Sequence, residues 1–549
     1  MKKYISKLTK KRIYVPFLAA CLLFTTTSYK SDFFEIAKQI EIFTSVFKEI
    51  NMNYVDETEP AQLMNTAITS MLNDLDPYTH FWTEQEVEQG RIRQSRDYTG
   101  IGATLLTGDN EILIKEIFKG QPADEAGLNA GDEILSIDGV SISGFQEDAG
   151  QLLKGAPGSS VTLKFKRQGE EKTTQLKRQP EKKKAVPFYT LIDGKTGYVV
   201  LSKFTRSASK ETKNAIELLK KQGAEKIILD LRGNPGGLLS EAVNTANLFL
   251  PKGQTIVTTK SVIEKYNKTY QTKKQPLDRQ IPVAVLINGR SASASEIVSG
   301  SLQDLDRGVI IGAQSFGKGL VQRPKKLTYG TQMKITISRY YTPSGRCIQA
   351  LNYRNRNGKG KAIRRERSDF KEFMTTNGRK VYGGGGIMPD IKMNAAKFSG
   401  ITKALVDKQM IFDYATQFYY SHDFKSVADF NFTDSDYSDF LGYLNRKDFN
   451  YQTKAEKALA ESKKAAADED LQNELQDEYS RLQKAFKEAK ENALTEKKPE
   501  IKRLLTDEIL TRYFYAEGRY NYSVKENPEI LEAVEVLNNG ERYNSVLGK

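Results

Sequence analysis

A serine-rich segment has the residue types and the setting of a nucleophile. Residues 288–297 have the sequence Asn-Gly-Arg-Ser-Ala-Ser-Ala-Ser-Glu-Ile. They follow an apolar run that predicts a strand over 283–287, and they lead into a segment, 293–303, whose apolar spacing predicts a helix. A serine at such a junction is exposed at the carboxyl edge of a sheet, where helix N-terminal N–H groups can stabilise an oxyanion. The spacing from Ser293 to Glu296 also fits a capping box, S-x-x-E, which merely starts a helix.

A lysine in a glycine-rich loop is the second candidate for chemistry. Residues 312–319 have the sequence Gly-Ala-Gln-Ser-Phe-Gly-Lys-Gly and follow a predicted strand, 309–311. A lysine acts as a general base only where its surroundings favour the neutral amine, and a tight glycine loop can bury Lys318 in that way. The same letters nearly match a nucleotide-binding P-loop, but Gly319 stands where the Mg²⁺-binding hydroxyl belongs. A surface lysine in a glycine turn is a further alternative.

A third loop supplies backbone donors. Residues 230–237, Asp-Leu-Arg-Gly-Asn-Pro-Gly-Gly, end the predicted strand 226–231, and their N–H groups either face an anion or form an ordinary turn. Because the carboxyl ends of parallel strands meet at one edge of a sheet, we expect the three loops to converge there. The two histidines, His80 and His422, lie outside this region, so a Ser–Lys arrangement is expected rather than a Ser–His–Asp triad.

The elements that must position these groups alternate between strands and helices over residues 195–345. A helix predicted over 240–250 separates the first two strands, and the strands themselves are continuous apolar runs, which indicates that both faces of the sheet are covered. This order predicts an α/β core with a largely parallel sheet. The 549 residues are enough for about three or four domains, so a multidomain α/β protein is expected.

The remaining segments predict the domain organisation. We expect a signal peptide (1–28), an N-terminal helical region (29–95), a glycine-punctuated β-rich domain (96–180), the α/β core (185–398) with an exposed basic insertion (351–382), and a helical C-terminal region (399–549). Lys454–Leu494, rich in Ala, Glu, Lys and Leu, predicts a solvated helical hairpin within that last region.

The net charge of +14 is concentrated in two places. Residues 1–12 carry six basic residues and no acid, and residues 354–380 carry ten Lys/Arg against three Asp/Glu. The rest of the chain is close to neutral, so nucleic acid is not an expected partner. The two cysteines, Cys21 and Cys347, exclude a disulfide-dense scaffold and a four-thiolate metal site.

The N-terminus has the order of a secretory signal. The basic start is followed by an apolar run over 13–24 and by Thr-Thr-Thr-Ser at 25–28, which predicts export to the periplasm or cell envelope. An uncleaved anchor helix is one alternative. A lipid anchor at Cys21 is another, because Leu18–Cys21 is similar to a lipobox, although the apolar run continues past the cysteine.

Together the motifs resemble those of the carboxy-terminal processing (tail-specific) proteases, serine peptidases with a Ser–Lys dyad and an embedded PDZ domain. The matching segments are Ser291–Glu296, Phe316–Gly319, Asp230–Gly237 and Gly385–Asp390. The resemblance implies a crotonase/Clp-protease-like core and no cofactor or metal. It makes Ser293 the nucleophile, Lys318 the general base and Gln322 the residue that orients the lysine.

The same resemblance implies an oxyanion hole and a supporting acid. The hole would use the N–H of Ala294 and that of either Gly236 or Gly237, and the choice between these glycines stays open. Glu296 corresponds to an acidic position of the family near the dyad.

Residues Gly100, Ile101, Gly102 and Ala103 look like the carboxylate-binding loop of a PDZ domain. In such a loop, backbone N–H groups capture a terminal carboxylate while the peptide adds a strand to the sheet edge. The chain departs from the family at Lys154, where many relatives carry arginine, and this puts coupling between PDZ occupancy and activity in doubt. A β-rich spacer that binds nothing is the alternative.

The sequence therefore predicts an exported endopeptidase that cleaves unfolded or precursor proteins near the C-terminal tails that its PDZ domain captures. The alternatives are a catalytically silent PDZ adaptor of the envelope and a nucleotide hydrolase. A homodimer and contact with the membrane surface are further partners that the sequence allows.

Overall fold

The computed structural model describes residues 33–94, 99–108, 111–143, 149–180, 184–357, 360, 362–393 and 398–549. The chain divides into two compact units, Met1–Phe81 and Trp82–Lys549. The predicted signal peptide and Cys21 lie outside the described residues. Within the described part of the chain, no helix has both the length and the apolar character needed to cross a membrane.

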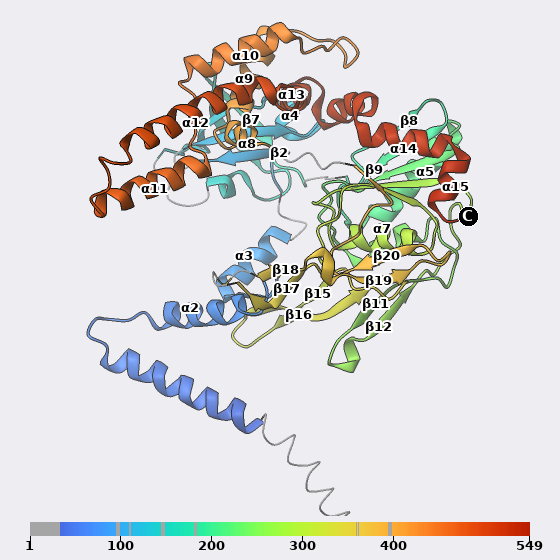
Figure 1. Ribbon diagram of the computed structural model, residues 1–549, viewed down its shortest axis with the longest axis horizontal. Helices are drawn as coiled ribbons and strands as arrows, with labels where there is room; N and C mark the ends of the chain where they lie inside the picture. The colour runs from blue at the N-terminus through green and yellow to red at the C-terminus, as the bar shows by residue number, and fades with distance from the viewer. Residues whose placement is uncertain are drawn as a thin grey trace, which may run out of the picture. The chain divides into compact units, whose positions relative to one another are not determined.

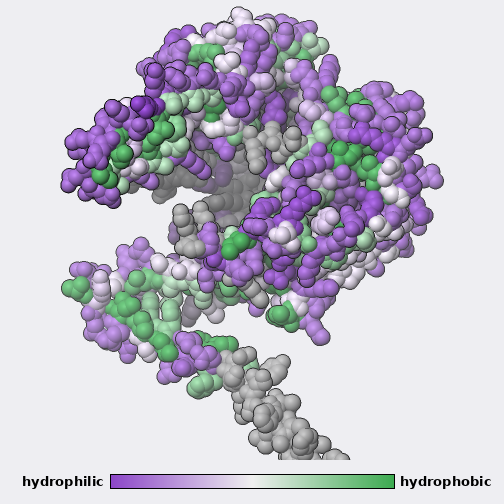
Figure 2. Space-filling view, viewed as in Figure 1, coloured by the Kyte–Doolittle hydropathy of each residue, from purple (hydrophilic) through white to green (hydrophobic). Residues whose placement is uncertain are grey.

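The first unit contains two helices, which lie within the predicted N-terminal helical region. One covers residues 33–53 and the other is α2 (Pro60–Asn73), followed by the short strand β1 (His80–Trp82) that crosses the unit boundary. Large apolar side chains of helix 33–53 are exposed, including Ile40 at 61% and Phe43 at 45%. Figure 2 shows hydrophobic residues along this unit at the lower left.

The predicted PDZ domain is an antiparallel sheet in the order β2-β3-β4-β6-β7, with β5 pairing β4. Helix α3 (Glu84–Gln94) precedes it, and its elements are β2 (Ala103–Thr107), β3 (Ile112–Ile117), α4 (Pro122–Glu125), β4 (Glu133–Ile137), β5 (Val140–Ser141), the 3₁₀ helix η1 (Ala149–Leu153), β6 (Ser160–Arg167) and β7 (Glu170–Lys177). Among the described strands, β2 pairs with β3 alone, so it forms an edge of the sheet.

The central sheet has the order β21-β14-β13-β10-β9-β8. Its strands are β8 (Phe188–Ile192), β9 (Thr196–Val200), β10 (Lys226–Asp230), β13 (Val283–Ile287), β14 (Val309–Gly312) and β21 (Ile391–Lys392). All neighbours are parallel except the β8–β9 pair, as in the register Ile227↔Val283. The predicted multidomain α/β class is thus confirmed, with a largely parallel sheet at its centre (Figure 1).

Alternate strand residues face two different layers of helices. One face of the sheet packs in a single core with α5 (Ala208–Lys221), α6 (Leu239–Ala246) and α7 (Ala294–Asp304). The other face packs against α14 (Pro528–Asn538) and α15 (Gly540–Val546). The last helices of the chain therefore complete the core, although the sequence assigned residues 399–549 to one separate helical region.

A second, antiparallel sheet carries the strand that follows Lys318. Its described pairs join β15 (Leu320–Lys326) to β16 (Gln332–Tyr341), β16 to β11 (Thr255–Lys260), and β11 to β12 (Lys268–Gln271). The 3₁₀ helix η2 (Glu264–Tyr266) lies between β11 and β12.

The basic insertion is only partly the exposed segment that the sequence predicts. It forms two hairpins, β17 (Leu351–Arg356) with β18 (Ala362–Arg364) and β19 (Lys371–Met374) with β20 (Lys380–Gly383), and η3 (Arg367–Asp369) lies between them. Arg379 pairs with Asp306 and with Asp390, each at 2.6 Å. Val381 is buried at 4% exposure. These ion pairs and the burial of Val381 anchor the second hairpin in the core. Removing the Arg379 side chain would leave two buried carboxylates without their cationic partner.

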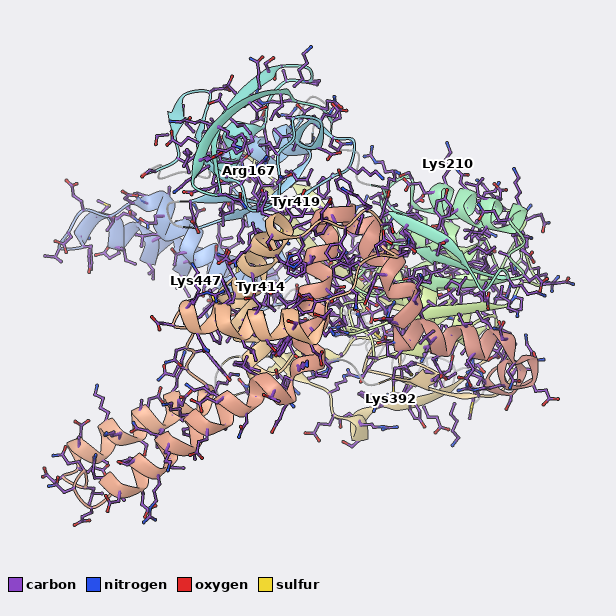
Figure 3. All side chains as sticks on the ribbon, turned by 90° about the horizontal axis from the view of Figure 1, so that it is seen from above. Arg167, Lys210, Lys392, Tyr414, Tyr419 and Lys447 are labelled. Atoms are coloured by element: carbon purple, nitrogen blue, oxygen red, sulfur yellow. The ribbon has the colours of Figure 1, made fainter. Side chains whose placement is uncertain are left out.

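The helical C-terminal region is confirmed. Its helices are α8 (Gly400–Asp407), α9 (Met410–Ser421), α10 (Asp434–Arg446), α11 (Lys454–Asp468), α12 (Gln476–Glu496) and α13 (Lys498–Glu526). Helices α11 and α12 form the predicted hairpin, in which the Tyr479 hydroxyl lies 3.2 Å from the carbonyl oxygen of Ser462. Tyr414 of α9 lies in the aromatic core of this region (Figure 3).

Candidate active site

Burial distinguishes the three serines of the serine-rich segment. Ser291 and Ser295 are fully buried, and their hydroxyls donate to the carbonyl oxygens of Leu231 at 2.8 Å and of Asn234 at 2.9 Å. Ser293 is partly exposed and is the N-cap residue of α7. Of the three hydroxyls, that of Ser293 is the one placed to meet a substrate.

The backbone of Ser293 is strained. Its φ is +55° and its ψ −110°, outside the regions that residues with a Cβ ordinarily occupy. Such conformations persist where the surrounding structure enforces them, and the nucleophile of a strand–turn–helix elbow is one such place. The strained turn presents the serine at the carboxyl edge of the sheet, as the sequence predicts.

The carboxyl group of Glu296 holds this turn and the lysine loop together. It accepts hydrogen bonds from the Ser293 N–H at 2.7 Å, the Ser315 hydroxyl at 2.6 Å, the Gly317 N–H at 2.7 Å and the Lys318 N–H at 3.0 Å. The capping contact to Ser293 is therefore present, and the same carboxyl group also fixes the segment that carries the predicted base. A single acid thus serves both the helix start and the site.

Glu296 is completely buried, and this burial raises its pKa to about 7. The four hydrogen bonds oppose the shift, because each stabilises the ionised form. The carboxyl group therefore changes charge near neutral pH at the point where the two loops meet.

A tyrosine that the sequence did not single out bridges the same two residues. Tyr340 of β16 is 1% exposed, and its hydroxyl donates to the carbonyl oxygen of Lys318 and lies 3.3 Å from that of Ser293. No motif connects Tyr340 with these residues, and it reaches them because β15 and β16 pair in an antiparallel hairpin.

The packing of the lysine loop explains its glycines. Gly317 has φ +89°, and a Cβ there would lie 2.4 Å from that of Ala350. The N–H of Gly319 donates to the side chain of Gln349 at 2.8 Å. Because the N–H groups of Gly317 and Lys318 already bind Glu296, they are not available to cradle a phosphate. This occupation argues against the P-loop alternative.

The Gly385–Asp390 motif supports the loop from the other side. Ile387 exchanges hydrogen bonds with Ser315, since its N–H donates to the serine hydroxyl at 2.6 Å and its carbonyl accepts the serine N–H at 3.0 Å. The Asp390 carboxyl accepts the N–H of Ile310 at 2.8 Å, next to the start of the loop.

The Asp230–Gly237 turn packs directly against the serine. Asn234 is fully buried, and its carbonyl accepts the N–H of Ala292 at 3.0 Å. Gly236 has φ +100°, and a Cβ there would lie 2.9 Å from that of Ser293 and 3.0 Å from the nitrogen of Ala294. The structure therefore brings the three predicted loops together, and only glycine fits at position 236.

Hydrogen bonding distinguishes the two glycines of the predicted oxyanion hole. The N–H of Gly236 donates to the Asn234 side chain at 2.9 Å. Phe204 donates to the Gly236 carbonyl at 3.1 Å and accepts from Leu238 at 2.9 Å, so the N–H of Gly237 points away from Phe204. Among the described residues, neither this N–H nor that of Ala294 donates a hydrogen bond. Of the two glycines, Gly237 is therefore the one whose N–H, with that of Ala294, fits the predicted oxyanion hole.

Gln322 lies on β15 at an irregularity of the β15–β16 pairing. Its side-chain amide donates to the hydroxyl of Thr336 at 3.2 Å. The predicted role of Gln322 in orienting Lys318 stays a prediction.

His422 caps the end of α9, where its ring stacks on Phe418 with centroids 3.8 Å apart.

The predicted carboxylate-binding loop begins beside β2. The Gly100 N–H is occupied by the carbonyl of Gln179 at 3.2 Å, whereas those of Ile101 and Gly102 donate no hydrogen bond within the described part of the chain. Gly102 has φ +76°, and a Cβ there would lie 2.2 Å from that of Gln121. Ala103 begins the edge strand. Two successive donors therefore sit at the start of an edge, as PDZ-type capture requires.

Three family models match parts of the chain. Residues 195–353 match peptidase family S41, residues 113–167 match a PDZ domain, and residues 401–537 match the C-terminal helical domain of probable PDZ-proteases.

Similar proteins have been described in staphylococci. A probable CtpA-like serine protease of Staphylococcus aureus (strain COL) is 35% identical over 308 residues, which cover 55% of this chain and 61% of that protein. The corresponding protein of Staphylococcus epidermidis is 34% identical over 313 residues, which cover 56% and 63%. The chain therefore spans about three fifths of the length of these relatives.

A solved structure, the photosystem II D1 C-terminal processing protease, is 26% identical and covers 64% of this chain and 92% of that chain, with a TM-score of 0.37. The family and sequence matches confirm the resemblance predicted from the motifs. Matches to a PDZ domain, to peptidase family S41 and to the helical domain of PDZ-proteases follow one another along the chain, and these matches support a serine-type peptidase similar to the carboxy-terminal processing proteases.

Proposed function

We propose that this protein is an endopeptidase that cleaves other proteins near their C-termini, with Ser293 as nucleophile and Lys318 as general base. The observation that carries the proposal is the shared carboxyl group of Glu296, which binds the N–H of Ser293 and the N–H of Lys318 from two different loops. A nucleophile and its base must be held in one fixed geometry, and a single buried anchor for both provides it.

The reaction uses the protein's own groups. The Ser293 hydroxyl attacks the carbonyl carbon of the scissile peptide bond, and its proton passes to the Lys318 amine. The N–H groups of Gly237 and Ala294 stabilise the resulting oxyanion. The C–N bond then breaks as Lys318 returns the proton to the leaving amine. Water then attacks the acyl carbon and gives a proton to the Lys318 amine, and the C–O bond to Ser293 breaks as Lys318 returns that proton to the serine oxygen.

The PDZ domain captures the substrate tail. The donors of Ile101 and Gly102 bind the terminal carboxylate, and the tail pairs with the edge strand β2. Ala103 and Leu105 of β2 and Leu152 of η1 are partly buried apolar residues packed against the core of this domain. An apolar C-terminal residue is therefore the preferred ligand.

The proposal is tested by mapping new C-termini. The mature protein is incubated with an unfolded substrate whose apolar tail ends either in a free carboxylate or in an amide, and the products are identified by mass spectrometry. We expect internal cleavage of the free-tailed substrate, slower cleavage of the amide by about tenfold, and none with Ser293→Ala. Equal cleavage by Ser293→Ala contradicts the assignment of the nucleophile.

Covalent labelling of the serine distinguishes the peptidase from the alternative of a catalytically silent PDZ adaptor. An adaptor binds tails without forming a covalent adduct, whereas a serine peptidase is labelled at Ser293 by a serine-directed phosphonate. Ser293 and Lys318 are both present and connected through Glu296, which favours the peptidase.

We also propose export to the periplasm or cell envelope, on the basis of the basic and apolar order of residues 1–28. N-terminal sequencing of the protein from an envelope fraction is expected to give a start near residue 29. A lipid-modified start at Cys21 would instead indicate a lipoprotein, and an intact Met1 in the cytosol would contradict export. Homodimerisation and contact with a membrane surface stay predictions.

A further inference from the structure

Helix α13 contains a strained kink. Phe514 has φ −131° and ψ 16°, and Tyr515 has φ 57° and ψ −169°, a region that residues other than glycine almost never occupy. The kink is closely packed, because a Cβ on the buried Gly518 would lie 2.1 Å from that of Phe514. A conformation of this kind costs about 1–3 kcal/mol and persists only where neighbouring contacts hold it.

The two halves of α13 belong to different cores. Before the kink, Ile501, Leu505 and Ile509 are buried in the core of the helical region. After the kink, Val524 is buried in the core of the peptidase sheet, and Tyr520 stacks on Phe188 of β8 with centroids 5.6 Å apart. Any change of angle at the kink therefore moves the second half relative to the first.

At the kink, Tyr515 contacts the PDZ domain. Its hydroxyl donates to the carboxyl group of Asp124 in α4 at 2.6 Å, and its ring packs against the PDZ core. The other carboxyl oxygen of Asp124 accepts the N–H of Gly120 at 2.7 Å. The Lys119 ammonium lies 5.7 Å from the centre of the Tyr515 ring and 3.5 Å from the Glu517 carboxyl group. We name the contact between Tyr515 and Asp124 the latch.

A second contact between the same elements lies near the latch. The side chain of Asn129 donates to the hydroxyl of Tyr420 at 3.3 Å. Gly131 packs so closely on α9 that a Cβ there would lie 2.4 Å from the Thr416 methyl carbon. The PDZ domain is therefore seated on α9 and α13 at more than one point.

The far end of α13 reaches the loop that forms the oxyanion hole. Asn527 caps α14, and its side-chain oxygen accepts a hydrogen bond from the Arg232 guanidinium at 2.7 Å. Glu529 lies 3.2 Å from the same guanidinium, which also pairs with Asp230 at 2.6 Å. Arg232 belongs to the Asp230–Gly237 turn, so residues of the C-terminal region fix the turn that carries the Gly237 N–H.

We propose that α13 transmits the position of the PDZ domain to the oxyanion hole. The latch holds the strained kink, the kink sets the direction of the second half of the helix, and Asn527 with Glu529 sets the place of Arg232. Arg232 and Asn527 are positioning residues. The inference rests on the proposed function for the role of Gly237, and the coupling itself is measurable without substrate.

Hydrogen–deuterium exchange of the full-length mature chain tests the coupling. Tyr515→Phe and Asp124→Asn each weaken the latch bond. We expect each to raise amide exchange in residues 231–237 by about threefold or more, and the double variant to add little to either single change. The matched control is Tyr513→Phe, because the Tyr513 hydroxyl donates to the carbonyl oxygens of Tyr419 at 3.0 Å and His422 at 2.8 Å, both outside the PDZ domain.

Two outcomes overturn the inference. In one, exchange rises around residues 119–124 and 515 while residues 231–237 are unchanged, which means that the latch opens without effect on the turn. In the other, exchange around the latch itself does not rise, or Tyr513→Phe changes residues 231–237 as much as Tyr515→Phe does.

Kinetics give a second readout. With a short fluorogenic peptide, Asn527→Ala is expected to lower kcat about tenfold at unchanged KM, since it displaces a donor that acts on the oxyanion rather than on bound substrate. A rise in KM at constant kcat contradicts the positioning role. If the wild-type chain cleaves nothing while exchange still shows the coupling, the proposed function fails and the inference stands.

Discussion

Replacing Ser293 by alanine is expected to lower kcat for peptide hydrolysis by about 10⁴-fold or more, because no other hydroxyl of the serine-rich segment is placed to attack. Ser291 and Ser295 are buried and donate to backbone carbonyls. Lys318→Ala is expected to have an effect of similar size, since the serine then has no base. Initial rates with a fluorogenic peptide measure both losses, and thermal unfolding checks that the variants are folded.

Ser301→Ala is the matched control for the nucleophile. Ser301 is buried in α7, and its hydroxyl donates to the carbonyl of Val298 at 3.0 Å, a hydrogen bond within its own helix. The loss of one such hydrogen bond costs about 1 kcal/mol of stability and is expected to leave kcat nearly unchanged. The assignment is wrong if Ser293→Ala retains activity, or if a phosphonate labels Ser291 or Ser295 in its place.

Glu296→Gln is expected to reduce activity by about 100-fold or more. Four donors converge on the carboxyl group, and a glutamine amide would turn N–H groups toward some of them and leave donors unsatisfied. The resulting displacement affects the start of α7 and the loop of Lys318 together, and small displacements at a catalytic pair are costly. The expected signature is a fall in kcat, measured by steady-state kinetics with the same peptide.

The control for this substitution is Glu241→Gln. Glu241 is likewise buried, at 8% exposure, and accepts from the N–H and hydroxyl of Ser209 at 2.9 and 2.7 Å and from the side chain of Asn244 at 3.2 Å, none of which belongs to the serine-rich segment or the lysine loop. Its replacement tests whether the mere loss of a buried, hydrogen-bonded carboxyl group lowers activity. Equal losses of kcat in the two variants would contradict a specific role for Glu296.

The same carboxyl group predicts a pH-dependent stability. Burial raises the pKa of Glu296 to about 7, above its ordinary value of 4.5, so the folded state holds the proton more tightly than the unfolded state. The associated stabilisation is complete below pH 4.5 and is lost as the pH rises through about 7. Relative to Glu296→Gln, the free energy of unfolding of the wild type should fall by about 3 kcal/mol from pH 4.5 to 8. Urea titrations measure this difference, and parallel pH curves for the two proteins would contradict it.

Patterns in the sequence were sufficient to predict a secondary-structure element where the local pattern is compatible with only one kind of element. The strand Val283–Ile287 has the predicted bounds, because a buried strand is a continuous apolar run with clear ends. The helix predicted over 240–250 ends at Ala246 instead, and the side chain of Asn247 binds the Leu250 carbonyl at 3.1 Å. The spacing of apolar residues does not predict where a polar side chain will end a helix.

The sequence did not predict which elements pack against one another. The apolar face of α14 indicates that another element covers it, but the residues of α14 do not identify the central sheet as that element. The basic insertion is a similar case. Its charge predicted exposure, whereas Arg379 pairs with Asp390 and with Asp306, which lies 73 residues away along the chain, so the pairing with Asp306 depends on the tertiary fold.

The sequence by itself determined the candidate groups: one serine-rich strand end, one lysine loop and one glycine turn, all expected to meet at the carboxyl edge of a parallel sheet. Tertiary structure decided how they meet. Burial of Ser291 and Ser295 leaves Ser293 for a substrate, and the bond from the Gly236 N–H to Asn234 leaves Gly237 as the available donor. Accessibility and peptide-plane orientation depend on contacts between distant segments, and these are not encoded by the type of any single residue.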